Sequence, residues 1–347
     1  MTDRKIYPSI DIVKFIMAML ILTQHTSNEW AHSTGLVHAF FGLGNFAVPF
    51  FFACSGFLFF SKMNILDGIS QKEYYIKWST RIGKMYLVWS AIYLCFVFYS
   101  WVSRNILFER LPGLIHGAVV YSTYATIWFL PALWVGVSIC YLMKRYCSMR
   151  IMWITMILLM IVGNLFGSYS NIMTQDTYVA SFYKWYMSIF ITWRNGIFNG
   201  APYVFIGLLL AENKACKTTQ RENTIATCIF SAAFLAEAFI ISHYHLSTAT
   251  DMGFMMAPAI FFMLNTLIKW DIKQRTIWQH FRNLSMLVFL SQRLFLTALP
   301  SVLPGMKEWI LSLPEVSIYF YFISVVLTFS VLIERLSKRY KFLKVLW

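Results

Sequence analysis

Long apolar runs without charged residues alternate with short polar segments along the whole chain. Nothing is charged between Lys84 and Arg104, or between Arg150 and Asp176. A helix that crosses a membrane needs about 20 mostly apolar residues, so these runs predict transmembrane helices. The pattern predicts ten spans, at residues 9–27, 36–60, 83–102, 126–143, 151–168, 195–212, 224–242, 252–269, 284–302 and 316–334.

The composition supports a membrane protein. Of the 347 residues, 59% are hydrophobic and 13% are charged, whereas soluble domains contain about 25% charged residues. The mean hydropathy is +0.60. These values exclude a soluble enzyme, a disordered chain and a disulfide-rich secreted module. The six cysteines form no C-x-x-C pair, so we expect neither a disulfide framework nor a metal site.

The placement of basic residues predicts the topology. If the N-terminus is cytoplasmic, 23 of the 29 lysines and arginines fall on cytoplasmic segments or helix ends. We therefore expect an all-α, polytopic integral membrane helical bundle with about ten transmembrane helices, both termini in the cytoplasm and one domain over residues 1–347. The net charge of +14 then reflects topology and contact with anionic membrane lipid. Nothing in the spacing resembles a nucleic-acid-binding motif, so no nucleic-acid partner is expected.

Charged and titratable residues inside the spans are candidates for function, because a charge in a membrane is costly. Asp11 and Lys14 begin the first span, either as an interfacial salt bridge or as part of a site. His25 follows Lys14 by eleven residues, about 16 Å along a helix. Histidine exchanges protons near neutral pH, so His25 is either a catalytic group or a hydrogen-bonded structural one. The roles of Glu237 and Arg293 stay open at this point.

A basic stripe marks the inner end of the third predicted helix. Lys77, Arg81 and Lys84 are spaced to share one helix face. Such a stripe suits phosphate groups that approach from the cytoplasm, and it equally suits ordinary anchoring of a helix end.

Small and aromatic residues mark three further segments. Ser55 lies in a phenylalanine-rich run with a neighbouring glycine, Trp128 precedes Phe-Leu-Pro, and Arg194-Asn195 begins the sixth span. Ser55 is either a nucleophile or a packing residue, since small residues allow helices to approach closely. The arginine either orients a polar acceptor or anchors its helix.

Taken together, these segments resemble the acyltransferase 3 family of integral membrane acyltransferases, and the resemblance covers nearly the whole chain. The matching segments, in family order, are Lys14 to His25 with ten residues between them, Val48 to Phe57 as the phenylalanine-rich Ser-Gly-Phe run, Arg81-Ile82-Gly83-Lys84 as an Arg-x-x-Arg element, Trp128-Phe129-Leu130, and Arg194-Asn195-Gly196. The chain looks like the small stand-alone bacterial type without a fused extracytoplasmic domain.

The chain departs from the family pattern at two places where many members have a histidine. Phe289-Leu290-Ser291-Gln292 stands where many members have Tyr-Leu-x-His, and Ala125-Thr126-Ile127 precedes the Trp-Phe-Leu segment. If either histidine assists the acceptor in relatives, that assistance is missing here.

The resemblance implies transfer of an acyl group, commonly acetyl, from cytoplasmic acetyl-CoA to a hydroxyl of a cell-surface carbohydrate or related envelope acceptor. It places the chain in the bacterial cytoplasmic membrane as a multi-pass protein. It implies that His25 is catalytic, as a general base or as the carrier of the acyl group. The donor-binding residues are then Lys14, Arg81 and Lys84, and the supporting or acceptor-side residues are Asp11, Ser55, Trp128, Arg194 and Asn195.

A transporter or flippase of a small amphiphile or amino acid is the alternative function. Membrane domains that resemble this family also occur fused to amino-acid racemases, where a transport role has been proposed. The oligomeric state, the acyl chain and the acceptor stay open.

Overall fold

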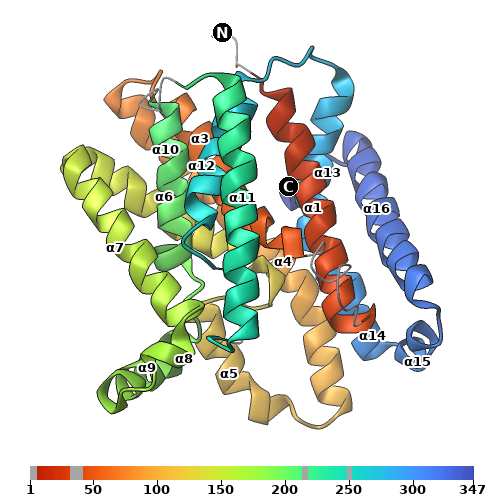
Figure 1. Cartoon of the computed structure of the whole chain (residues 1–347). Coiled ribbons are helices and arrows are strands. Elements are labelled where there is room, and N and C mark those ends of the chain that lie inside the picture. Colours follow the sequence, from red (N-terminus) through yellow and green to blue (C-terminus); the bar gives the residue numbers. More distant parts are fainter. Residues whose placement is uncertain (1–5, 32–41, 213–217, 248–251) are drawn as a thin grey trace. The chain divides into compact units, whose positions relative to one another are not determined.

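The computed structural model describes residues 6–31, 42–212, 218–247 and 252–347. Within these residues the regular structure is entirely helical, so the predicted all-α class is confirmed (Figure 1). The longer helices are α1 (Pro8–Thr26), α3 (Ala47–Met63), α4 (Gly68–Ser103), α5 (Leu107–Val120), α6 (Phe129–Tyr146), α7 (Met149–Gly167), α9 (Thr177–Phe190), α10 (Ala201–Ala211), α11 (Gln220–His243), α12 (Met256–Lys269), α13 (Thr276–Arg293) and α16 (Glu315–Arg339). The shorter ones are η1 (Ser27–Ala31), η2 (Gly42–Phe46), η3 (Thr126–Trp128), α8 (Ser170–Met173), η4 (Gly196–Gly200), η5 (Leu294–Ala298), α14 (Leu299–Val302), α15 (Met306–Leu311) and η6 (Lys341–Leu346).

An apolar helix corresponds to each of the ten predicted spans. Among the described residues, eight helical segments are long and apolar enough to cross a membrane, and two more, Gly196–Ala211 and Met256–Lys269, are apolar but shorter. Residues 36–41 of the second predicted span lie outside the described residues. The polytopic architecture is therefore confirmed, while the cytoplasmic placement of the termini stays a prediction.

The helices form two compact units, and each unit combines distant parts of the sequence. Unit 1 comprises Met1–Ala47, Arg81–Trp128 and Ile272–Trp347, and unit 2 comprises Val48–Thr80 and Phe129–Asp271. Helix α4 begins in unit 2 and continues in unit 1. The prediction of one domain over residues 1–347 stays a prediction.

In unit 1, α1 packs against α13 along its length. One face of α1 is buried, at positions that recur with the helical period: Ile10, Lys14, Met17, Ala18, Ile21 and Leu22. Near the start of both helices the Phe15 and Phe281 rings stack with centroids 4.8 Å apart. Beyond their ends, the Trp30 indole N–H donates to the Leu296 carbonyl at 3.0 Å.

These contacts pair the start of α1 with the start of α13, and the end with the end, so the two helices are parallel. Successive membrane spans alternate in direction. Parallel neighbours must therefore be separated by an odd number of spans. The predicted topology places seven spans between these two, which agrees with the observed direction.

In unit 2, glycines allow α3 and α10 to pack backbone against backbone. A Cβ atom on Gly207 would overlap the carbonyl oxygen of Ala53 and the amide nitrogen of Phe57. A Cβ atom on Gly56 would likewise overlap the carbonyl of Val204. Close helix approach through small residues is a common means of association in membranes.

The carboxylate of Glu237, in the second half of α11, has a structural role within unit 2. Its two oxygens accept hydrogen bonds from the Phe254 and Met255 amides at 2.8 and 2.9 Å, just before α12 begins. The Tyr169 hydroxyl also donates to it at 2.8 Å. An anion at a helix N-terminus interacts favourably with the helix dipole. The role of Glu237, which the sequence left open, is to join α11 to the start of α12.

We predict that Gly207→Ala lowers the stability of the protein by about 1–3 kcal/mol, because the added methyl group forces α3 and α10 apart. Gly113→Ala in α5 is the matched control, since its Cβ meets no atom within 4 Å. That substitution should leave stability unchanged or raise it by up to about 1 kcal/mol through helix propensity. Thermal unfolding of the purified protein in detergent measures both, and equal effects would contradict the close packing.

Candidate active site

His25 lies in the last turn of α1 and belongs to a cluster of three charged or titratable side chains in unit 1. Its Nδ1 atom is 3.2 Å from Nη2 of Arg293 in α13. The same nitrogen is 3.9 Å from Oε1 of Glu29, one helical turn further along. Nη1 of Arg293 forms an ion pair with that Glu29 oxygen. The cluster thus joins the ends of α1 and α13.

The arginine determines which nitrogen of His25 carries a proton. A guanidinium group keeps its protons in proteins and can only donate hydrogen bonds. Nδ1 of His25 must therefore accept from Arg293, and the neutral ring carries its proton on Nε2. The Nδ1 lone pair is therefore oriented to accept a hydrogen bond from another donor if that donor replaces Arg293.

Both helices change geometry at this cluster. α1 continues as a π-helix over Ser27–Ala31, and α13 continues as a π-helix over Leu294–Ala298. Such segments are rare and occur frequently at functional sites. Glu29 lies within the first of them, and Arg293 immediately precedes the second.

Several buried polar atoms around the cluster have no hydrogen-bond partner among the described residues. They are Ser27 Oγ, Glu29 Oε2, Ser291 Oγ, Gln292 Oε1 and Arg293 Nε. An unpaired buried polar atom costs about 1–3 kcal/mol, so such atoms are uncommon and call for an explanation. Their concentration at one end of the α1–α13 pair is what a site for a polar ligand requires.

By the resemblance noted from the sequence, Gln292 stands where many acyltransferase 3 members have histidine. Its Nε2 donates to the carbonyl of Phe289 at 2.9 Å, and its side chain is fully buried next to Arg293. The Gln292 oxygen accepts no hydrogen bond from the described residues, but an amide cannot exchange a proton as an imidazole does.

Two stacked tyrosines lie beside the cluster. The rings of Tyr93 in α4 and Tyr124 have centroids 4.3 Å apart. Tyr124 shares a 2.7 Å hydrogen bond with Thr297, which in turn donates to the Arg293 carbonyl at 2.9 Å. Burial raises the pKa of the Tyr124 hydroxyl, so it stays protonated. The Tyr93 hydroxyl donates to the Leu290 carbonyl at 2.6 Å, which fixes α4 against α13.

A second ion pair joins the starts of α1 and α13. Arg282 contacts both carboxylate oxygens of Asp11, at 2.9 and 2.5 Å, and the Asp11 side chain is only 4% exposed. From the sequence, Asp11 was either part of an interfacial salt bridge or a site residue. In the structure it forms a bidentate ion pair with Arg282, 271 positions away. Lys14, one turn later on α1, is also buried.

His280 and Glu334 form a further pair in unit 1, between the start of α13 and the end of α16. His280 Nδ1 is 2.9 Å from a Glu334 oxygen, and Asn283 donates to the same oxygen at 2.8 Å. Phe295, just beyond the end of α13, packs on Phe329, which precedes Glu334 in α16, so the two helices are antiparallel. The pairing with His280 also satisfies a carboxylate that is 8% exposed.

The predicted donor-binding residues all belong to unit 1. Arg81 and Lys84 are exposed on α4, and precede Tyr93 by about 18 and 14 Å of helix rise. Lys14 precedes His25 by about 16 Å on α1. Each of these cations therefore lies more than two helical turns before the residue on its own helix that contacts α13. That residue is Tyr93 on α4 and His25 on α1.

The supporting residues divide between the units. In unit 1, Trp128 stacks on Tyr121 with centroids 5.9 Å apart. Ser55 in α3, together with exposed Arg194 and half-buried Asn195, belongs to unit 2.

Asn195 caps the short helix η4. Its Oδ1 accepts from the amides of Ile197 and Phe198 at 2.9 and 3.1 Å, and its Nδ2 donates to the Tyr186 hydroxyl at 2.8 Å. These bonds explain why asparagine begins this helix.

Sequence reasoning missed Glu29 and left the role of Arg293 open. The signal for Glu29 was available, because it follows His25 by four residues and so shares its helix face. The partner of Arg293 was not readable, because it depends on which helices pack together.

The fold is that of a polytopic membrane protein, and comparison with known families gives its class. Residues 7–335 match the acyltransferase 3 family model, described as an acyltransferase domain. Since the match spans nearly the whole chain, the chain belongs to this family, as the sequence motifs predicted.

Two curated proteins are similar to the chain. One is named "Amino-acid racemase", from Enterococcus faecalis, and is 25% identical over 80% of this chain and 38% of its own length. The other, "Serine/alanine racemase" from Enterococcus gallinarum, is 22% identical over 81% of this chain and 40% of its own length. The chain thus spans about two fifths of these relatives. No solved structure matches.

We predict that Arg282→Ala destabilises the protein by about 3–5 kcal/mol, because it leaves the buried Asp11 carboxylate without its partner. Adding Asp11→Asn should recover much of this loss, since the uncompensated charge disappears. Thermal unfolding of both single variants and the double variant measures the coupling. Additive losses would show that the two side chains do not stabilise each other.

Proposed function

We propose that the protein transfers an acyl group, with acetyl as the first candidate, from acyl-CoA to a hydroxyl of an envelope carbohydrate at the bacterial cytoplasmic membrane. The observation that carries the proposal is the contact of His25 Nδ1 with Arg293 beside Glu29, at the point where both helices become π-helical. Family membership supports acyl transfer. The CoA donor and the carbohydrate acceptor rest on the resemblance.

In this proposal His25 is the group that accepts the proton of the acceptor hydroxyl. The hydroxyl takes the place of Arg293 as the donor to Nδ1, while Arg293 keeps its ion pair with Glu29. As the hydroxyl oxygen bonds to the thioester carbonyl carbon, its proton moves to Nδ1. The carbon–sulfur bond then breaks, and the departing thiolate takes the proton from Nδ1 of His25, which returns the imidazole to its neutral form.

Glu29 stabilises the charge that develops on His25. Once protonated, the imidazolium has a carboxylate oxygen within 3.9 Å of its Nδ1 atom. The interaction between opposite charges is strong where water is scarce, and it is stronger after proton transfer than before. Glu29 thus acts as a positioning and charge-stabilising residue. This geometry serves direct transfer from the thioester to the acceptor. If His25 carried the acyl group instead, a trapping experiment would find an acylated histidine.

The cations Lys14, Arg81 and Lys84 are proposed to hold the phosphates of the donor. Acyl-CoA has a polyanionic head and a long thin arm that ends in the thioester. The cations lie about 14–18 Å along their helices from Tyr93 on α4 or His25 on α1, and such an arm can span this distance. Arginine and lysine are the usual partners of phosphate groups.

A second candidate function is passage of an amino acid through the membrane. It is favoured by the names of the two similar proteins, both of which refer to amino-acid racemases. Proteoliposomes separate the candidates. Uptake of labelled serine or alanine without any acyl transfer would favour passage, whereas transfer of labelled acetyl from acetyl-CoA would favour the enzyme.

We predict that His25→Ala lowers the rate of acyl transfer at least about a hundredfold, the usual contribution of a general base. The protein should still insert and purify as the wild type does. His116→Ala, an exposed histidine in α5 of the same unit, is the control and should transfer at the wild-type rate. Transfer of labelled acetyl to the surface carbohydrate gives the readout, and full activity of the His25 variant would remove this residue from the mechanism.

We also predict that Arg81→Ala raises the KM for acyl-CoA about tenfold while leaving the KM for the acceptor unchanged, because one charged contact with phosphate is lost. Arg81→Lys should restore part of the donor affinity. Initial-rate kinetics with each substrate varied in turn provide the test. An unchanged donor KM would contradict the phosphate role.

A further inference from the structure

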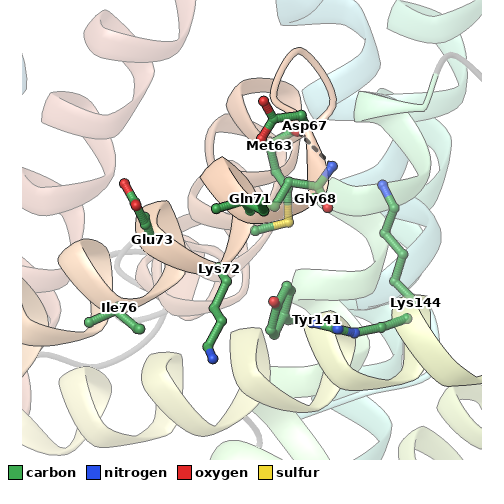
Figure 2. Close-up of a pocket in the computed structure, with 11 residues that line it drawn as sticks. Met63, Asp67, Gly68, Gln71, Lys72, Glu73, Ile76, Tyr141 and Lys144 are labelled. Carbon is green, nitrogen blue, oxygen red and sulfur yellow. Dashed lines mark hydrogen bonds between the residues drawn. The ribbon is translucent and has the colours of Figure 1, made fainter.

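Unit 2 contains a pocket of about 1070 Å³, and none of its lining residues has a role in the function proposed above. It lies between the corner that joins α3 to α4 and the last turn of α6 (Figure 2). Met63 and Gly68 line one side, while Tyr141, Lys144 and Arg145 come from α6. All of these residues belong to one compact unit.

The acidic residues of the pocket are already used by neighbouring groups. Asp67 Oδ1 accepts from the Ser70 amide at 2.8 Å and so caps the start of α4. This hydrogen bond lowers the pKa of the Asp67 carboxyl, which stays ionised. Glu73 pairs with Lys77 at 3.8 Å.

Lys144 is likewise occupied. Its Nζ atom pairs with Glu212 at 2.9 Å and donates to Asn64 at 2.5 Å. Two cations in the lining, Lys72 and Arg145, have no acidic partner among the described residues. They leave the pocket with a surplus of positive charge.

Apolar side chains flank one of these cations. Ile69 and Ile76 lie on α4 three residues before and four residues after Lys72, so the three share one helix face. The isoleucines are 80% and 50% exposed. This combination of a cation between two exposed apolar residues suits an amphiphile with an anionic head.

The pocket lies at the ends of apolar spans. The second candidate span ends at Met63, and the fourth ends at Tyr146, immediately after Lys144 and Arg145. The pocket thus lies where apolar membrane segments give way to polar sequence, which is the depth of lipid headgroups. The predicted topology puts this boundary on the cytoplasmic face, whose leaflet is rich in anionic lipid.

We propose that this pocket binds the phosphate of an anionic phospholipid, with Lys72 and Arg145 on the phosphate and the acyl chains along Ile69 and Ile76. Phosphate groups are the shared chemistry of phospholipids and of acyl-CoA. The exposed isoleucines favour the lipid, because the phosphate-bearing end of acyl-CoA has no apolar chain to cover them.

The experiment measures lipid retention on the purified protein by native mass spectrometry, from nanodiscs that contain phosphatidylglycerol and phosphatidylcholine. The test variant is Lys72→Ala with Arg145→Ala. The matched control is Arg150→Ala with Arg221→Ala, which removes two exposed cations of unit 2 outside the pocket. A parallel series offers acetyl-CoA and adenosine 3′,5′-bisphosphate in place of anionic lipid.

The proposal expects the test variant to lose at least about tenfold in affinity for phosphatidylglycerol, equivalent to about 1.4 kcal/mol, while the control variant keeps wild-type affinity. Ile69→Ser with Ile76→Ser should lower the affinity for phosphatidylglycerol without changing the charge of the pocket. Equal losses in the test and control variants would overturn the proposal, because they would indicate general attraction to a basic surface. Loss of affinity for the CoA probes but not for the lipid would overturn it in favour of a donor site.

Discussion

The parallel pairing of α1 with α13 is the constraint on which the rest of unit 1 depends. It is made by residues more than 260 positions apart, and charged contacts lie at both of its ends. Asp11 and Arg282 join the starts of the helices, and Arg293 joins their ends through Glu29 and His25. Buried charges are stable only when they are paired, so the two contacts permit a single register between the helices.

That register produces the candidate chemistry. The pairing brings a histidine, a carboxylate and a guanidinium together where both helices lose regular α-helical geometry. Around them lie buried polar atoms that have no hydrogen-bond partner in the described part of the chain. The guanidinium orients the imidazole, and the carboxylate can balance a positive charge on it. The same geometry explains why Arg293 is tolerated inside an apolar span, since its charge is paired.

The spans were predictable from sequence because lipid demands continuous apolar surface, and an apolar helix is found for every predicted span. The prediction for the third span stopped at the charges near Lys84, whereas α4 begins at Gly68, because a helix can continue beyond the apolar region into polar surroundings. His25 and Glu29 share a helix face that sequence reveals. Their link to Arg293, and the π-helical segments, depend on tertiary packing and leave no local signal.

A double-mutant cycle on transfer activity tests the central claim most directly. Glu29→Gln and Arg293→Gln each break the same ion pair, so groups that act as a unit should show strongly non-additive losses. The account predicts that the double variant transfers acyl groups no more slowly than the slower single variant, with both singles well below the wild type. Losses that multiply, or single variants with wild-type rates, would contradict it.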